Sequence, residues 1–244
     1  MSCSHKTLYV IIPAAGSGTR MHSDKNKLLL EVDGIPVIDR TVAAFKRFSE
    51  ESGYDIQAVL VVQPGMTEQW QEYIKDRPVF SVIRKITEGG DTRTASVNNG
   101  VHALDTGSDP DAPVFIHDAA RCLIDHDTLS RCLDAITRDN VDVCVAGVKL
   151  KNTIKKISVK DGTVTVESTP PRELFYEVQT PQCFKYSCLR RCYDDASKEG
   201  FEATDDTALA EHFGYEVIIV EGSYSNIKIT TPEDIDIAEA IIGH

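Results

Sequence analysis

The sequence is poor in positive charge. Among its 244 residues, 26 are Lys or Arg and 38 are Asp or Glu, which gives a formal net charge of −12 at pH 7. Proteins that bind nucleic acid or anionic membranes over a broad surface need an excess of cations to neutralise the phosphates. The charge balance therefore argues against both classes of partner. Any anionic ligand must be met by a local cluster of cations.

Long apolar segments and paired cysteines are also absent. No stretch approaches the roughly 20 apolar residues needed to span a bilayer. The first apolar run, residues 8–12, is short for a secretory signal peptide and is followed by Arg20 and Lys25. The seven cysteines are odd in number and none forms a C-x-x-C pair, which disfavours a disulfide framework and a zinc site. These absences predict a cytoplasmic protein with reduced thiols and no membrane association.

The residues that are present indicate a globular α/β protein. Its 41% hydrophobic and 26% charged residues are ordinary for that class. Apolar, β-branched runs predict strands at residues 7–13, 56–63, 80–86, 113–117, 141–148 and 216–221. Helical periodicity predicts helices at residues 37–50, 67–75, 92–104, 127–138 and 185–198. Two later helices are predicted from capping signals, one at Thr204 and one at Thr231-Pro232.

Most of these predicted strands are near-continuous in Val, Ile and Leu, as strands covered on both faces are. Strands and helices alternate over most of the chain, which favours a mainly parallel sheet with helices on both faces. We therefore expect one domain over residues 1–244, with an α/β, Rossmann-like, three-layer α/β/α fold and a mainly parallel mixed sheet.

One region interrupts the alternation. Two short runs of alternating polar and β-branched residues flank Asp161-Gly162, a dipeptide that is a strong β-hairpin signal. The hairpin is too small and too polar to be stable alone, so we expect an arm over about residues 150–176 that projects and docks elsewhere. From the residues alone, a partner subunit and a flap on the chain's own surface are both possible.

The segment "PAAGSGTRMHSDKNK", residues 13–27, follows the first predicted strand, where α/β proteins commonly bind phosphate. It lacks the third glycine of the NAD-type G-x-G-x-x-G motif, since Met21 stands there, and no Lys-Ser/Thr follows a glycine as in a P-loop. A glycine-rich turn without function is the simplest alternative. Backbone amides followed by Arg20, Lys25 and Lys27 nevertheless suit a triphosphate, because the amides cradle it and the cations offset its charge.

Several motifs together resemble one family. They are "PAAGSGTRM", "KNKLLLEVDG", "GGDTRTASVNNG", "HDAAR", "QTPQCF" and "NIKITTPED", in this order between about residues 10 and 241. Within the sugar-phosphate nucleotidyltransferases they are similar to the 2-C-methyl-D-erythritol 4-phosphate cytidylyltransferases. The resemblance implies transfer of a cytidylyl group from CTP to methylerythritol 4-phosphate, giving 4-diphosphocytidyl-2-C-methyl-D-erythritol and pyrophosphate in non-mevalonate isoprenoid biosynthesis. Positioning and charge stabilisation carry such a reaction, and no covalent nucleophile is needed.

Two other functions are compatible with much of this pattern, one of them without catalysis. Ribitol 5-phosphate cytidylyltransferases have the same fold and chemistry with another polyol phosphate, but "AAG" followed by "KNK" and the intact "HDAAR" favour the methylerythritol enzyme. A catalytically silent nucleotide-binding or scaffolding dimer would tolerate loss of Arg20, Lys27 or Lys228. All three residues are present.

The resemblance also implies roles for individual residues. Arg20 and Lys27 would hold the phosphates and stabilise the transition state, and Lys228 would position the acceptor. Arg172, also assigned to catalysis, would reach the neighbouring subunit's site from the arm, which implies a homodimer. The nucleotide would contact Ala14, Ala15, Gly16, Gly18, Gly90, Asp91, Ser96, Asp118 and Ala119. The acceptor would contact Asp118, Thr153, Arg172, Thr180 and Lys228.

Three positions depart from the family pattern: Asn26 replaces a common Pro, Cys122 replaces Pro after "HDAAR", and Pro171 precedes Arg172. His117 is expected to be structural, because its neighbour Asp118 carries the family role. The resemblance implies Mg²⁺ or another divalent cation with CTP. The sequence shows no dedicated carboxylate cage, so we expect phosphates and water to hold that ion.

Overall fold

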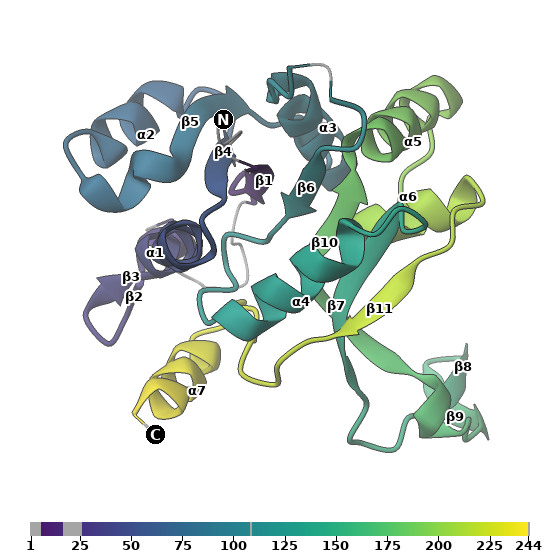
Figure 1. Ribbon diagram of the computed structural model, residues 1–244. Coiled ribbons are helices and arrows are strands. Elements are labelled where there is room, and N and C mark those ends of the chain that lie inside the picture. Colours follow the sequence, from purple (N-terminus) through teal and green to yellow (C-terminus); the bar gives the residue numbers. More distant parts are fainter. Residues whose placement is uncertain (1–5, 17–25, 108, 244) are drawn as a thin grey trace.

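The centre of the molecule is a seven-stranded sheet with the strand order β11-β7-β10-β6-β1-β4-β5 (Figure 1). The computed structural model describes residues 6–16, 26–107 and 109–243. All neighbouring strands are parallel except for the two pairs that β10 makes with β6 and β7, so the sheet is mixed and mainly parallel, as predicted. Its strands are β1 (Thr7–Pro13), β4 (Asp55–Val62), β5 (Ile83–Glu88), β6 (Pro113–Ile116), β7 (Val143–Lys149), β10 (Tyr176–Lys185) and β11 (Ile218–Glu221).

Helices cover both faces of the sheet, which gives the expected three-layer α/β/α arrangement (Figure 1). No helix in the described part of the chain is both long and apolar enough to cross a membrane. The helices are α1 (Val37–Ser52), α2 (Thr67–Ile74), α3 (Arg93–Ala103), α4 (His126–Ile136), α5 (Tyr186–Glu199), α6 (Asp206–His212) and α7 (Glu233–Ile242).

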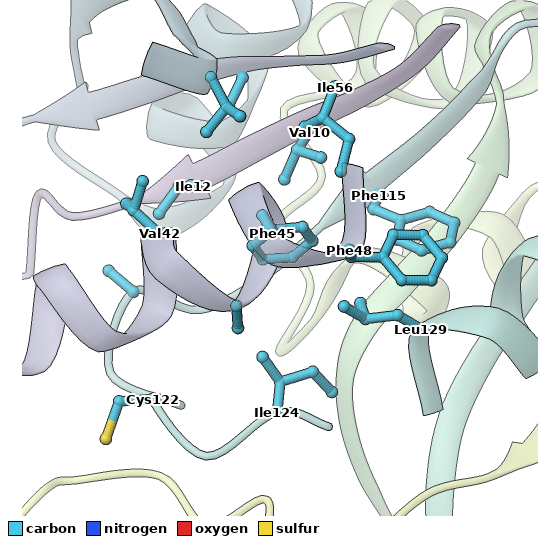
Figure 2. Close-up of a cluster of buried hydrophobic side chains, with 14 of the residues drawn as sticks. Val10, Ile12, Val42, Phe45, Phe48, Ile56, Phe115, Cys122, Ile124 and Leu129 are labelled. Atoms are coloured by element: carbon cyan, nitrogen blue, oxygen red, sulfur yellow. The ribbon is translucent and has the colours of Figure 1, made fainter. Parts of the chain in front are cut away.

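The pleat of β1 divides the apolar side chains between two cores. Val10 and Ile12 face the core that α1 and α4 cover, where Phe45, Phe48 and Leu129 pack around them (Figure 2). Ile11 points to the opposite core, which α3, α5 and α6 cover. Successive residues of a strand alternate between faces, and both faces of this strand are buried, which explains its continuous apolar run.

Two stretches of the sheet differ from the prediction. Residues 80–86 were predicted as one strand, but Pro78–Val82 forms a 3-10 helix and β5 begins only at Ile83. Pro78 at the start of that turn has a fixed φ and no N–H to give to a strand ladder. β10 was not predicted, because Pro181 in its middle argues against a central strand. The ladder with β7 accommodates the proline by a register shift between Val178 and Gln182.

Helix α6 begins one residue later than the sequence suggested. Thr204 was expected to cap it, but the cap is Asp205, whose carboxylate accepts a hydrogen bond from the backbone N–H of Ala208 at 2.8 Å. Asp and Thr are both good N-cap residues, so two adjacent candidates could not be separated from the sequence.

The predicted hairpin is present and projects from the main sheet (Figure 1). It consists of β8 (Lys156–Lys160) and β9 (Thr163–Ser168), joined by Asp161 and Gly162 at φ 49° and 74°. A second small hairpin, β2 (Glu31–Val32) and β3 (Ile35–Pro36), precedes α1. Positive φ at both central residues is the turn geometry that the Asp-Gly signal predicts.

One face of the projecting hairpin is apolar and uncovered. Ile157 pairs with Val166 and Val159 with Val164, so all four side chains share a face, and they are between 49% and 67% exposed. The opposite face is polar. An apolar face of this kind normally packs against something.

Candidate active site

The carboxyl ends of β1, β5 and β6 meet at a cleft of about 480 Å³. The chain passes from β1 to β4 on one side and later enters β6 on the other side of β1, so the cleft lies where the strand order reverses. Ligands bind at this point in open α/β sheets. Of the residues that the sequence assigned to the site, the cleft is lined by Ala14, Ala15, Gly16, Lys27, Gly90, Asp91, Ser96, Asp118, Ala119 and Lys228.

The first wall of the cleft is the end of β1 and the short 3-10 helix Lys27–Leu29. Asn26 precedes that helix, and its side-chain oxygen accepts a hydrogen bond from the backbone N–H of Leu28 at 3.0 Å. The side-chain cap therefore orders the turn that carries Lys27, although the usual proline is missing. Gly18 and Arg20 lie outside the described residues.

The second wall is the loop between β5 and α3, in which Ser96 holds Gly90. The Ser96 hydroxyl accepts from the N–H of Gly90 at 3.1 Å and donates to its carbonyl at 3.2 Å. A Cβ at Gly89 would lie 2.6 Å from the Ser96 hydroxyl and 2.8 Å from the Cβ of Ala15. Only glycine allows this approach, so the loop after β1 and the loop after β5 pack directly against each other.

Asp118 follows β6 and forms an ion pair with Lys228. The Lys228 Nζ lies 2.7 Å from Asp118 Oδ2, and the Arg121 Nε lies 3.7 Å from the same oxygen. Burial by itself raises the pKa of Asp118, but the cations of Lys228, Arg93 and Arg121 outweigh it and hold that pKa below its usual value. Asp118 is therefore a carboxylate, and it fixes an ammonium group at the edge of the cleft.

Thr180 lies behind Asp118 and is not among the residues that line the cleft. Its hydroxyl accepts from the N–H of Asp118 at 3.1 Å and lies 3.0 Å from His117 Nδ1. His117 Nε2 lies 3.0 Å from the carbonyl of Arg121, so this nitrogen donates and Nδ1 accepts from Thr180. Burial lowers the pKa of His117 to about 4. The ring is thus neutral and structural, as the sequence suggested.

The two arm residues lie away from the cleft of their own chain. Thr153 and Arg172 are exposed and neither lines it. Arg172 Nη1 donates to the carbonyl of Lys151 at 2.7 Å, a contact that orders the base of the arm. The other unusual residue, Cys122, belongs to the same buried core as Ile124 (Figure 2), and burial raises the pKa of its thiol to about 11.

Sequence reasoning missed Thr92 and Arg93, which also line the cleft. Thr92 caps α3 by accepting from the N–H of Ala95 at 3.1 Å. Arg93 forms a double hydrogen bond with Asp206, which lies 113 residues away in the chain. Arg93 lies in the motif "GGDTRTASVNNG" and Asp206 at the start of a predicted helix, "TDDTALAEH". No local sequence pattern indicates that these two residues pair.

A metal would find few protein ligands here. Asp91 and Asp118 are the carboxylates in the cleft lining, and the described residues contain no group of three or more His, Cys, Asp or Glu that could hold an ion. Because Asp118 already pairs with Lys228, the cleft residues that the structure describes do not fit a protein-held cation.

The comparisons with known proteins agree with this geometry. The model of the IspD family, 2-C-methyl-D-erythritol 4-phosphate cytidylyltransferase, matches residues 8–244. The enzyme of that name from a Nostoc species is 40% identical over 236 residues, 97% of this chain and 98% of the relative. The one from Geotalea uraniireducens is 39% identical over 233 residues, 95% of each chain.

Solved structures give the same result. The crystal structure of 4-diphosphocytidyl-2C-methyl-D-erythritol synthase from Anaerococcus prevotii has a TM-score of 0.78 and 30% identity, covering 98% of this chain and 99% of that one. The 2-C-methyl-D-erythritol 4-phosphate cytidylyltransferase from Thermus thermophilus has a TM-score of 0.73 at 30% identity, covering 98% and 100%. This chain belongs to the 2-C-methyl-D-erythritol 4-phosphate cytidylyltransferase family.

Proposed function

We propose that the cleft transfers a cytidylyl group from CTP to methylerythritol 4-phosphate, with separate walls for the triphosphate, the base and the acceptor. The family is that of a cytidylyltransferase with this substrate. The observation that carries the assignment is that three segments distant in sequence line one cleft at the reversal of the sheet: the segment with Gly16 and Lys27, the loop with Gly90, and the segment with Lys228.

In this reaction a phosphate oxygen of the acceptor attacks the α-phosphorus of CTP. The bond from that phosphorus to the bridging oxygen of the β-phosphate breaks, and pyrophosphate leaves with the electron pair. Negative charge builds on the α-phosphate oxygens, so fixed cations stabilise the transition state more than the reactants. Lys27, which lines the cleft, and Arg20, by family resemblance, would supply those cations on the triphosphate side.

Lys228 supplies the acceptor side. A lysine ammonium has three donors, and Asp118 takes one of them, which leaves two for the phosphate of the acceptor. The Lys228 side chain is 39% exposed, so a ligand in the cleft can reach it. The carboxylate of Asp118 holds the ammonium group of Lys228 in place at the edge of the cleft.

The arm would complete the site of a second copy. Its apolar face is exposed, and Thr153 and Arg172 lie off their own cleft. A homodimer in which each hairpin packs on the other subunit would cover that face. It would also bring one more guanidinium to the acceptor phosphate.

Mg²⁺ would arrive bound to the triphosphate of CTP, because residues 6–16, 26–107 and 109–243 provide no cage for it in the cleft. The cation would offset phosphate charge as part of the substrate. The six described cysteines are unpaired and buried, which supports a reducing, cytoplasmic location.

Steady-state kinetics of two variants test this division of roles. Loss of a preorganised cation costs ~10²–10³ in kcat, and we expect this for Lys27→Ala. We expect Lys228→Met mainly to raise KM for methylerythritol 4-phosphate and to leave KM for CTP nearly unchanged. If both variants changed KM for CTP and KM for methylerythritol 4-phosphate equally, the triphosphate and the acceptor would not have separate walls.

A further inference from the structure

Arg93 is bound at its tip by a carboxylate that has no contact with solvent. Its Nη1 and Nη2 donate to Oδ1 and Oδ2 of Asp206 at 2.7 and 2.6 Å. The Asp206 side chain is fully buried, whereas that of Arg93 is 32% exposed and lines the cleft. A bidentate pair of this kind fixes the guanidinium in both position and plane.

Asp206, the first residue of α6, is itself held by side chains from two other elements. The Tyr193 hydroxyl of α5 donates to its carboxylate. The backbone N–H groups of Asp206 and Thr207 donate to the side-chain oxygen of Gln182 in β10 at 2.8 and 3.0 Å. The carboxylate therefore cannot move unless α5, α6 or β10 moves with it.

The residues that shape the base side of the cleft share one helical turn with Arg93. Thr92, which caps α3, and Ser96, which holds Gly90 by two hydrogen bonds, lie within that turn. A shift of the first turn of α3 would move the Ser96 hydroxyl and the backbone of Gly90 together. Arg93 also contributes to the field that lowers the pKa of Asp118.

We propose that the Arg93–Asp206 pair is a positioning device for base selection, which locks the first turn of α3 so that the loop from Gly90 to Ser96 accepts cytosine and rejects uracil. The inference rests on the proposed function, since it names what sets the nucleotide specificity of the same cleft. Cytosine and uracil differ in which positions of one edge donate and accept hydrogen bonds. A site discriminates between such edges only while its own donors and acceptors stay in place.

The test compares kcat and KM for CTP and UTP, at saturating methylerythritol 4-phosphate, in Arg93→Gln, Arg93→Lys and Tyr193→Phe. Small displacements of positioning groups cost up to ~10²-fold, and we expect Arg93→Gln to raise KM for CTP about tenfold with a smaller loss in kcat. The CTP:UTP ratio of kcat/KM should fall by a similar factor. Arg93→Lys should restore part of that ratio, and Tyr193→Phe should lower it by less.

Arg84→Gln is the matched control, because Arg84 pairs with Asp55 at 3.4 Å as an exposed ion pair outside the cleft. It should leave the ratio unchanged. If Arg93→Gln does not fold, Arg93→Lys and Tyr193→Phe carry the test. An unchanged CTP:UTP ratio in every folded variant, whatever the loss of thermal stability, would show that the pair only stabilises the fold.

The same variants are titrated with CTP and UTP without acceptor, and the dissociation constants are compared. This binding measurement does not depend on turnover. If the wild-type protein bound CTP more tightly than UTP but released no pyrophosphate, the proposed function would be wrong. The positioning role of Arg93 would then be judged from the dissociation constants of the variants. Equal loss of affinity for CTP and UTP in Arg93→Gln would overturn the positioning role.

Discussion

At the level of single residues, the ion pair between Asp118 and Lys228 fixes the ammonium group that we propose binds the acceptor. Replacing Asp118 by Asn keeps the shape and removes the charge that fixes the ammonium group 2.7 Å away. A hydrogen bond to a charged group contributes ~1.5–3 kcal/mol. We therefore expect Asp118→Asn to raise KM for methylerythritol 4-phosphate roughly tenfold or more at saturating CTP.

Asp91→Asn is the contrast, because Asp91 also lines the cleft and is proposed to contact the base of CTP rather than the acceptor. Its effect should fall on CTP. If Asp118→Asn left KM for the acceptor unchanged, the ion pair would have no part in acceptor binding.

His117 should make the stability depend on pH in a defined window. Its pKa is about 4 in the folded protein against 6.5 for the unperturbed group. Between these values the unfolded chain binds a proton that the folded protein does not, so stability falls as pH falls from 6.5 towards 4. The full loss is about 3 kcal/mol, and it does not grow further below pH 4.

Urea unfolding between pH 4 and 7 measures this effect. His117→Asn should lose that part of the pH dependence, whereas His126→Asn, at a half-exposed histidine on α4, should retain it. Identical pH profiles for wild type and His117→Asn would show that His117 does not titrate as the structure requires.

Which site residues the sequence could predict depends on how far apart their partners are. Gly90, Asp118 and Lys228 were assigned by family resemblance of local motifs, and the cleft contains all three. The pairing of Arg93 with Asp206 could not be found in this way, because the contact depends on how α3 and α6 pack. Thr180 was placed in the pocket wall, but it supports Asp118 from behind.

At the level of secondary-structure elements, the contact between the first loop and the loop after β5 depends on Gly89. An alanine Cβ there would lie 2.6 Å from the Ser96 hydroxyl and 2.8 Å from Ala15, closer than such atoms approach. We expect Gly89→Ala to push the two loops apart and to raise KM for CTP by ~10-fold or more, measured by steady-state pyrophosphate release. Gly243→Ala, whose Cβ would meet nothing closer than 3.5 Å, is the control.

Gly243→Ala should keep the kinetic constants of the wild type. If Gly89→Ala kept them as well, the close packing of the two loops would have no effect on CTP binding.

Elements that depend on local signals were predicted better than those that depend on neighbours. The hairpin of β8 and β9 was found because Asp161-Gly162 specifies its turn. β10 was missed because its place in the sheet comes from pairing with β6 and β7 on either side. The end of the 3-10 helix Pro78–Val82 was predicted as strand because Phe80 and Val82 are apolar. The structure buries both of them, but in a 3-10 helix.

At the level of the whole molecule, the exposed face of the hairpin should bury itself in a dimer. Val159→Asp places a charge on that face, where the side chain is 67% exposed in the single chain. We expect the fold to survive and the dimer to dissociate, as measured by light scattering at several concentrations. Thr165→Asp, on the opposite face, should remain dimeric, and a monomeric wild type would contradict the arm's proposed role.

Mixing two inactive variants tests whether the sites are shared. In a heterodimer of Lys27→Ala and Arg172→Ala, one cleft has Lys27 from its own chain and Arg172 from the other, and the second cleft lacks both. Random exchange makes half of the dimers mixed, so roughly one quarter of the wild-type activity should return. If mixing restored no activity although subunits exchanged, Arg172 would act within its own chain.

The most direct measurement is pyrophosphate release by the purified protein with Mg²⁺, in which each nucleoside triphosphate is offered with each acceptor. Turnover with CTP and methylerythritol 4-phosphate, and far slower turnover with ATP, GTP, UTP or ribitol 5-phosphate, is the predicted result. Turnover with ribitol 5-phosphate alone would keep the chemistry and contradict the acceptor assignment. Absence of turnover with either acceptor would contradict the account of the cleft as a cytidylyltransferase site.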